Sequence, residues 1–128
     1  MPQGLLVRFF GTELERRWRR DLTGCFFGQD YPSQTRARLY SNALQIVGHP
    51  CGLHQIVEVL SNAGHEMHSE VVLLPLAVGV GRAPRIVGFS HALDALGREE
   101  FLEAFKHNTR NEWFDVGAGT PTRQPHSH

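Results

Sequence analysis

The middle of the chain constrains the fold most, because its apolar residues follow the spacing of β-strands. Three runs rich in strand-forming residues lie at 53–60, 65–80 and 85–90. Short turns of small, polar or proline residues join them at 61–64 and 79–84. Strands joined by such short turns pair antiparallel, so the sequence predicts a three-stranded meander. Pro75, inside the second run, has no amide hydrogen and should lie where no ladder hydrogen bond is needed.

The chain ahead of the meander follows the helical period instead. Apolar residues recur every four positions through 12–22, which places them on one face of a helix. Thr12 with Glu15 three residues later has the pattern of a capping box at its start. A longer helix is predicted over 33–47, with Ser33 as its N-cap.

The two ends of the chain complete the predicted layout. The apolar run 5–10 is ended by a glycine and predicts a mostly buried strand. Residues 98–107 show the spacing of an amphipathic helix. The chain of 128 residues has the length of one domain, which we expect to occupy 1–107. The remainder, 108–128, is expected to form a flexible tail.

Composition excludes several classes of protein. The chain is 41% hydrophobic and 20% charged, which is typical of a folded domain. Its 13 basic and 13 acidic residues cancel, so we expect no nucleic-acid partner. No apolar run approaches the length of a membrane span, so we expect no membrane partner. The N-terminus lacks the pattern of a secretion signal, so we expect a cytoplasmic protein. Cys25 and Cys51 form no Cys-x-x-Cys motif and are expected to be reduced thiols, although a disulfide between them stays open.

Helices grouped ahead of a meander predict an α+β fold, with an antiparallel sheet and helices packed on one face. Three stretches add a more specific pattern: Phe-Phe-Gly-Thr at 9–12, Arg-Asp-Leu-Thr-Gly at 20–24, and Glu-Val-Val-Leu-Leu-Pro-Leu at 70–76, followed by Ile-Val-Gly at 86–88. In their order and spacing, over roughly 5–93, they resemble a PAS sensor domain. More narrowly, the chain is similar to the PAS-like family of short, single-domain bacterial proteins.

This resemblance implies a regulatory or sensory domain that takes part in signal transduction. Such a domain would bind a small-molecule ligand or a signalling partner protein and respond by a change in conformation or oligomeric state. A homodimer is the expected assembly. Family members usually carry an upstream segment with a Trp and a first strand, whereas this chain begins almost at the second strand. The fold therefore either lacks its first strand or is a shortened variant, and an open sheet edge could pair with another chain.

The chemistry-bearing residues do not predict an enzyme. There is no Gly-x-Ser-x-Gly, phosphate-binding glycine loop or His-Glu-x-x-His motif. Cys51 and His54, with His49 nearby, supply three ligands where structural zinc takes four, so no metal site is predicted. Haem-binding PAS domains use a histidine on the long helix, but 33–47 contains none. His49, just past that helix, is the one residue that keeps a haem sensor as an alternative.

A sheet with helices on one face can enclose a ligand pocket. The candidates to line it are the apolar residues of the long helix and of the three strands, namely Tyr40, Leu44, Val57, Val72 and Phe89. The Tyr40 hydroxyl would be the polar anchor. The same residues could instead form a filled core, which would make the chain a protein-interaction module. Solvent-exposed Val or Phe on the outer face of the sheet would favour that second interpretation.

Two polar clusters receive structural interpretations. The basic residues within 16–20 are predicted to be a solvated helix face, with Trp18 turned inward. His91 and Asp94 follow the last strand of the meander and are predicted to form a surface loop, with Asp94 capping the next helix.

Overall fold

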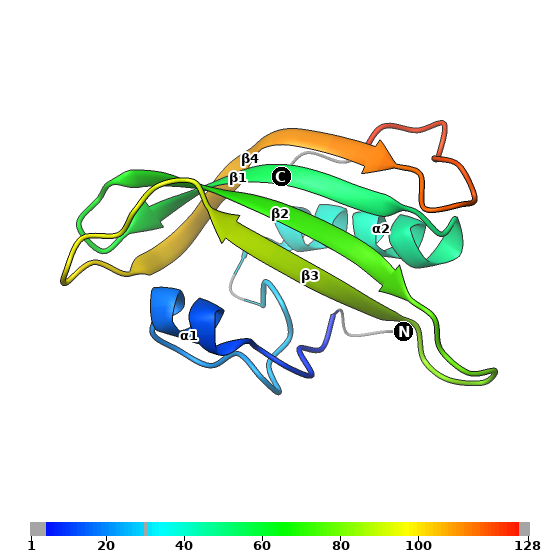
Figure 1. The fold of residues 1–128 in the computed structure, drawn as a ribbon, viewed down its shortest axis with the longest axis horizontal. Helices are drawn as coiled ribbons and strands as arrows, with labels where there is room; N and C mark the ends of the chain where they lie inside the picture. The colour runs from blue at the N-terminus through cyan, green and yellow to red at the C-terminus, as the bar shows by residue number, and fades with distance from the viewer. Residues whose placement is uncertain (1–4, 30, 126–128) are drawn as a thin grey trace.

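The computed structural model describes residues 5–29 and 31–125. Its elements in chain order are α1 (Thr12–Trp18), α2 (Ser33–Gly48), β1 (Gly52–Ser61), β2 (Glu66–Leu76), β3 (Arg85–Ala92) and β4 (Leu102–Phe114). The strands form one antiparallel sheet of order β3-β2-β1-β4, and α2 lies behind it in Figure 1. The predicted α+β class is confirmed.

The meander forms as predicted. β1 pairs with β2 from Leu53 opposite Leu73 to Leu60 opposite Glu66, and β2 pairs in turn with β3. Gly64, in the turn between β1 and β2, has a φ of +80°, a left-handed conformation that favours glycine. Pro75 lies beyond the last β1–β2 pair, where β2 has only β3 alongside. The missing amide hydrogen therefore costs no bond to β1.

The helix predicted over 98–107 is wrong, because 102–114 form strand β4 beside β1. The β1–β4 register shifts at three places, each of which inserts an extra residue in β4. As a result Leu102, Phe105 and Asn108, spaced three apart, all face the same side of the sheet. Bulges at this spacing give a strand the three-residue apolar period of a helix, which is why the sequence was misleading.

The end of the chain also differs from the prediction. The tail expected from residue 108 begins later, because 108–114 belong to β4. The segment beyond it folds back along the protein: the Trp113 Nε1 donates to the Arg123 carbonyl at 2.7 Å. The Asp115 carboxylate accepts hydrogen bonds from the backbone N–H groups of Gly117 and Gly119.

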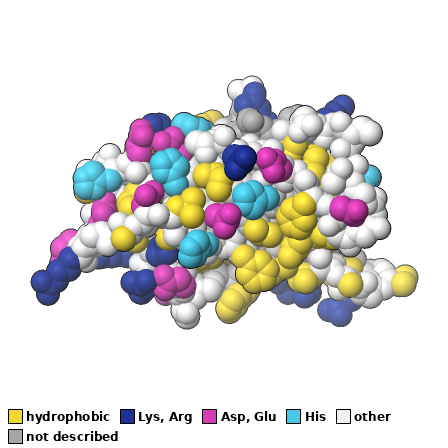
Figure 2. All heavy atoms as spheres, turned by 45° about the horizontal axis from the view of Figure 1, so that its top comes forward, with side chains coloured by type: hydrophobic (Ala, Val, Ile, Leu, Met, Phe, Trp, Pro, Cys, Tyr) yellow, Lys and Arg dark blue, Asp and Glu magenta, His cyan; other side chains and the backbone are white. Residues whose placement is uncertain are grey.

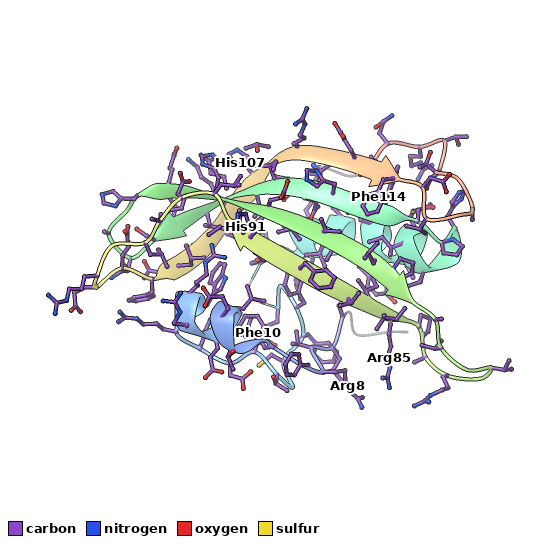
Figure 3. The ribbon with its side chains drawn as sticks, viewed as in Figure 1. Arg8, Phe10, Arg85, His91, His107 and Phe114 are labelled. Carbon is purple, nitrogen blue, oxygen red and sulfur yellow. The ribbon has the colours of Figure 1, made fainter. Side chains whose placement is uncertain are left out.

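The run 5–10 does not become a strand of the sheet, contrary to the prediction. It pairs instead with 24–27, through an isolated bridge between Leu6 and Phe26 and flanking backbone hydrogen bonds. Figure 3 shows Arg8 and Phe10 on the α1 side of β3, outside the sheet. Among the described strands β3 pairs only with β2, so β3 is an edge strand.

The two helices occur where predicted, but their ends differ. α2 matches the prediction to within one residue, and Pro32 rather than Ser33 is its N-cap. α1 ends at Trp18 and not near residue 22, because Arg19 adopts a left-handed conformation with φ of 52°. The capping box is absent, since the N-cap of α1 is Gly11.

The core lies between the helices and one face of the sheet, which we call the closed face. Leu53 and Val59 of β1 are fully buried there, with Ile46 from α2. A second group, Val59, Met67 and Leu102, packs against Trp18 at the end of α1. Both helices therefore cover the same face, as predicted, and the opposite face of the sheet is left open.

Candidate interaction surface and ligand pocket

The open face is defined by the residues that alternate with the buried ones. Residues paired across strands point to the same side of a sheet, so the registers identify its members. They are Gly52, His54, Ile56, Glu58, Leu60, Glu66, His68, Glu70, Val72, Leu74, Leu76, Arg85, Val87, Phe89, His91, Ala104, His107, Arg110, Glu112 and Phe114. No helix among the described residues covers them.

One half of the open face is apolar. Val72 of β2 lies opposite Phe89 of β3, and Leu74 lies opposite Val87. The Phe89 ring is 60% exposed, although it sits in the middle of a strand. Figure 2 shows hydrophobic side chains gathered in one region of the surface, next to a region of charged and histidine side chains. Contiguous exposed apolar surface of this kind marks a binding surface more often than a free one.

The other half carries histidines paired with carboxylates. Glu58 of β1 is nearly buried, 2.9 Å from His107 of β4 and 3.8 Å from His68 of β2. His68 also lies 3.2 Å from Asp94. His54 and Glu70, from adjacent strands, are 2.8 Å apart. Acidic side chains on this half of the face therefore alternate with histidines from the neighbouring strands.

Charge pairing continues at the edge of this cluster. Lys106 of β4 forms an ion pair with Glu66 of β2. The hydrogen bond from Lys106 lowers the pKa of Glu66, and the same bond raises the pKa of Lys106. Within the described chain, no three His, Cys, Asp or Glu side chains converge in a way that could hold a metal ion.

The closed face contains a buried cation that the sequence did not reveal. Arg17, on α1, is only 5% exposed, and its Nη2 donates to the Ser69 hydroxyl on β2 at 2.9 Å. Its Nε has no hydrogen-bond partner among the described residues. Burial lowers the pKa of the guanidinium, because a desolvated charge is unfavourable. The basic cluster is thus solvated at Arg16 but not at Arg17, while Trp18 does turn inward as predicted.

More polar residues face this side of the sheet. Gln55 of β1 donates to the Asn111 side-chain oxygen at 2.8 Å, and Asn108 donates to the same oxygen at 2.9 Å. Gln55 and Asn108 are both buried. The three side-chain amides of Gln55, Asn108 and Asn111 therefore form a hydrogen-bonded group that links β1 to β4.

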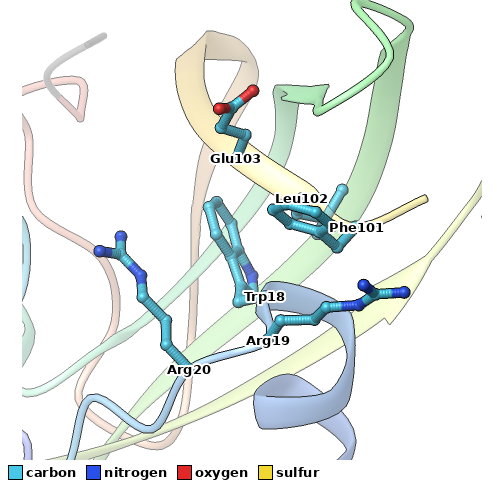
Figure 4. A pocket seen from close by; sticks show the side chains of 6 residues that line it. All are labelled: Trp18, Arg19, Arg20, Phe101, Leu102 and Glu103. Atoms are coloured by element: carbon cyan, nitrogen blue, oxygen red, sulfur yellow. The ribbon is translucent and has the colours of Figure 1, made fainter. Parts of the chain in front are cut away.

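A pocket of about 280 Å³ opens where α1 ends beside the start of β4. It is lined by Trp18, Arg19, Arg20, Phe101, Leu102 and Glu103, shown in Figure 4. The Arg19 guanidinium lies 5.0 Å from the centre of the Phe101 ring, a cation–π contact. Two sequence-distant segments build the pocket, and the sequence contained no signal that they would meet.

The predicted pocket residues do not come together. Val57 faces the closed side and packs against the core, but Val72 and Phe89 point to the open side. Tyr40 and Leu44 lie on α2, and the Leu44 side chain is 52% exposed. The reason is the alternation of side chains along a strand. Val57 pairs with Ser69 and shares its face, and Val72 is three positions after Ser69 in β2, so Val72 faces the opposite side.

The surroundings of His49 do not fit a haem. Its Nε2 is buried without a hydrogen-bond partner, and a Cβ added at Gly119 would lie 4.0 Å from it. The segment after β4 therefore occupies the space that a porphyrin ring would need beside this nitrogen. The protein's two cysteines, Cys25 and Cys51, are both free.

The loop after β3 is held by a different contact from the one predicted. No helix follows Asp94 in the described chain up to residue 125, so Asp94 does not cap one. Its carboxylate instead accepts a hydrogen bond from the backbone N–H of His68 at 2.7 Å. His91 projects from β3 on the open face, as Figure 3 shows with His107.

Comparison with family models, with curated proteins and with solved structures gave no match for this chain. No helix in the described part of the chain has the length and apolar character needed to cross a membrane. The functional assignment therefore rests on the two faces of the sheet and on the pocket.

Proposed function

We propose that this protein is a regulatory domain of the PAS-like kind that its sequence resembles, and that it acts by binding rather than by catalysis. Its open sheet face binds the same face of a second copy, and the signal is a change in oligomeric state. The observation that carries this proposal is the exposed Phe89 ring within the apolar half of the open face. The two free cysteines support the cytoplasm as its compartment.

The apolar half supplies the driving force for association. Phe89 is 60% exposed, and a Phe side chain has roughly 200 Å² of surface, so each copy could bury about 120 Å² through this ring alone. At about 25 cal/mol per Å², that burial contributes about 3 kcal/mol for each copy. Val72, Val87 and Leu74 extend the same patch.

The polar half favours a second copy as the partner. A face that carries one sign of charge would recruit the opposite sign, such as nucleic acid or an acidic peptide. Here Glu66 pairs with Lys106 and Glu112 pairs with Arg110, so formal charges of both signs lie side by side on the same half of the face. A two-fold axis brings a surface against itself, so a face with both signs interleaved can be complementary to its own copy.

Sedimentation velocity over a range of protein concentrations tests the proposal. The wild-type chain should dimerise, and Phe89→Thr, which keeps a strand-forming residue, should raise the dissociation constant by more than about a hundredfold. Val80→Thr is the matched control, because Val80 is fully exposed in the β2–β3 turn, outside the open face. A monomer at every concentration, or a Phe89→Thr variant that dimerises like the wild type, would overturn the assignment.

A further inference from the structure

The pocket at the end of α1 combines an apolar wall with cations. Trp18 and Leu102 form part of the core packing, and the Phe101 ring stands beside them (Figure 4). An aromatic ring of a ligand would therefore meet rigid apolar surface. The volume of about 280 Å³ is enough for a small molecule with one ring.

Two guanidinium groups, those of Arg19 and Arg20, line the pocket without a carboxylate partner from the described part of the chain. Among the described residues neither Arg19 nor Arg20 forms an ion pair, and Arg19 lies over the Phe101 ring. Glu103 lies across the pocket and leaves a net positive charge. Guanidinium groups bind carboxylates through paired hydrogen bonds, so an anionic group is the natural ligand of this pocket.

The backbone at this point is held in an uncommon conformation. Arg19 is the only residue other than glycine with a positive φ in the described chain. The left-handed region is unfavourable for a residue other than glycine, and such strain is often retained at binding sites. Here it ends α1 and places Arg19 and Arg20 at the pocket.

A hydrogen-bond donor inside the pocket is also free. The indole Nε1 of Trp18 has no hydrogen-bond partner among the described residues, whereas that of Trp113 donates to the Arg123 carbonyl. This nitrogen is not among the buried side-chain atoms that lack a partner, so it is open to solvent and available to a ligand.

We propose that this pocket binds a small aromatic carboxylate, with its ring against Trp18 and Phe101 and its carboxylate at Arg20. The site lies on the helix side of the sheet, so it is separate from the open face. Its occupation by ligand and the association of two copies are independent claims, and either can hold without the other.

The test is a titration of the isotope-labelled full chain with phenylacetate, followed by the two indole N–H signals in NMR spectra. The Trp18 signal should shift and saturate with a dissociation constant of about 1 mM, while the Trp113 signal stays in place and serves as the internal control. Trp113→Phe assigns the two signals. Saturation of neither signal up to about 20 mM overturns the proposal.

Three further probes separate the parts of the ligand. Acetate and inorganic phosphate carry the charge without the ring, and 2-phenylethanol carries the ring without the charge. Each should shift the Trp18 signal at least about tenfold more weakly than phenylacetate, because both halves contribute. If any of the three binds as well as phenylacetate, the site is not one for an aromatic carboxylate.

The matched variants are Arg20→Gln and Arg36→Gln, which remove the same charge from the pocket and from the exposed surface of α2. Arg20→Gln should weaken phenylacetate binding about tenfold, and Arg36→Gln should not change it. Arginines near a helix C-terminus also stabilise the helix, so thermal unfolding is measured in parallel. Equal binding by both variants, with both folded, contradicts the role of Arg20.

Discussion

The contact between Arg17 and Ser69 allows the cost of a buried charge to be measured. The Arg17 guanidinium is 5% exposed, and the Ser69 hydroxyl, itself buried, accepts its hydrogen bond at 2.9 Å. Ser69→Ala removes that acceptor and leaves a second N–H group of a buried cation without a partner, beside the unpaired Nε. A hydrogen bond to a charged group contributes about 1.5–3 kcal/mol, so we expect a loss of about 2 kcal/mol in the free energy of unfolding.

Replacing the charge itself should have a different result. Arg17→Met keeps a long apolar side chain but removes the desolvated guanidinium, which the described residues do not neutralise with a carboxylate within 4.0 Å. Exchange of a buried ionic group for a hydrophobic one is often neutral or stabilising. We therefore expect Arg17→Met to be as stable as the wild type or more stable. In that background Ser69→Ala should cost less than about 0.5 kcal/mol.

Urea unfolding followed by circular dichroism, at one fixed protein concentration, measures all four members of this cycle. Arg16→Met is the control on the same helix, since Arg16 is exposed and pairs only with Glu13. Solvent and salt screen that exposed pair, so its loss should change stability little. The reasoning is refuted if Ser69→Ala is as stable as the wild type, or if Arg17→Met loses more stability than Ser69→Ala.

Three further outcomes are expected. A Cβ at Gly52 would lie 2.2 Å from the Phe114 ring, so Gly52→Ala should lower the free energy of unfolding by about 1–3 kcal/mol. Thermal unfolding measures this, and an unchanged melting temperature would contradict the close packing of Phe114 on Gly52. Hydrogen bonds from a serine hydroxyl, a backbone N–H and a histidine lower the pKa of Glu100 from its ordinary 4.5 to about 2. The stabilisation by the ionised Glu100 is therefore complete above pH 4.5 and is lost as the pH falls towards 2. Glu100→Gln should make the urea midpoint depend less on pH over that window, and an unchanged dependence on pH would count against the reasoning. Burial raises the pKa of the Cys51 thiol, so a thiol reagent should modify the half-buried Cys25 first, and equal rates would argue against that burial.

Local patterns were sufficient for much of the fold. The strand runs and turns of the meander, and the period of α2, are properties of neighbouring residues, and the structure contains them nearly as predicted. The resemblance to a PAS-like domain remains a prediction. Local patterns failed where pairing between distant segments changed the period, as the bulges against β1 do in β4. They failed again at 5–10, where a strand-like run pairs with 24–27 rather than with the sheet.

The candidate sites depended more on tertiary structure than the elements did. The sequence predicted Val57, Val72 and Phe89 around one pocket, but the strand registers put Val57 on the closed face and the other two on the open face. The burial of Arg17 likewise followed from where α1 docks and not from its place in a basic run.

The sequence by itself determined the class of fold and the meander with the chemical character of its three strands, because these depend on residues close together along the chain. Only the tertiary structure decided which face stays open, which arginine is buried, and that 18–20 meet 101–103 in a pocket. The physical reason is that burial and contact depend on distances in space, which the spacing of residues along the chain does not contain.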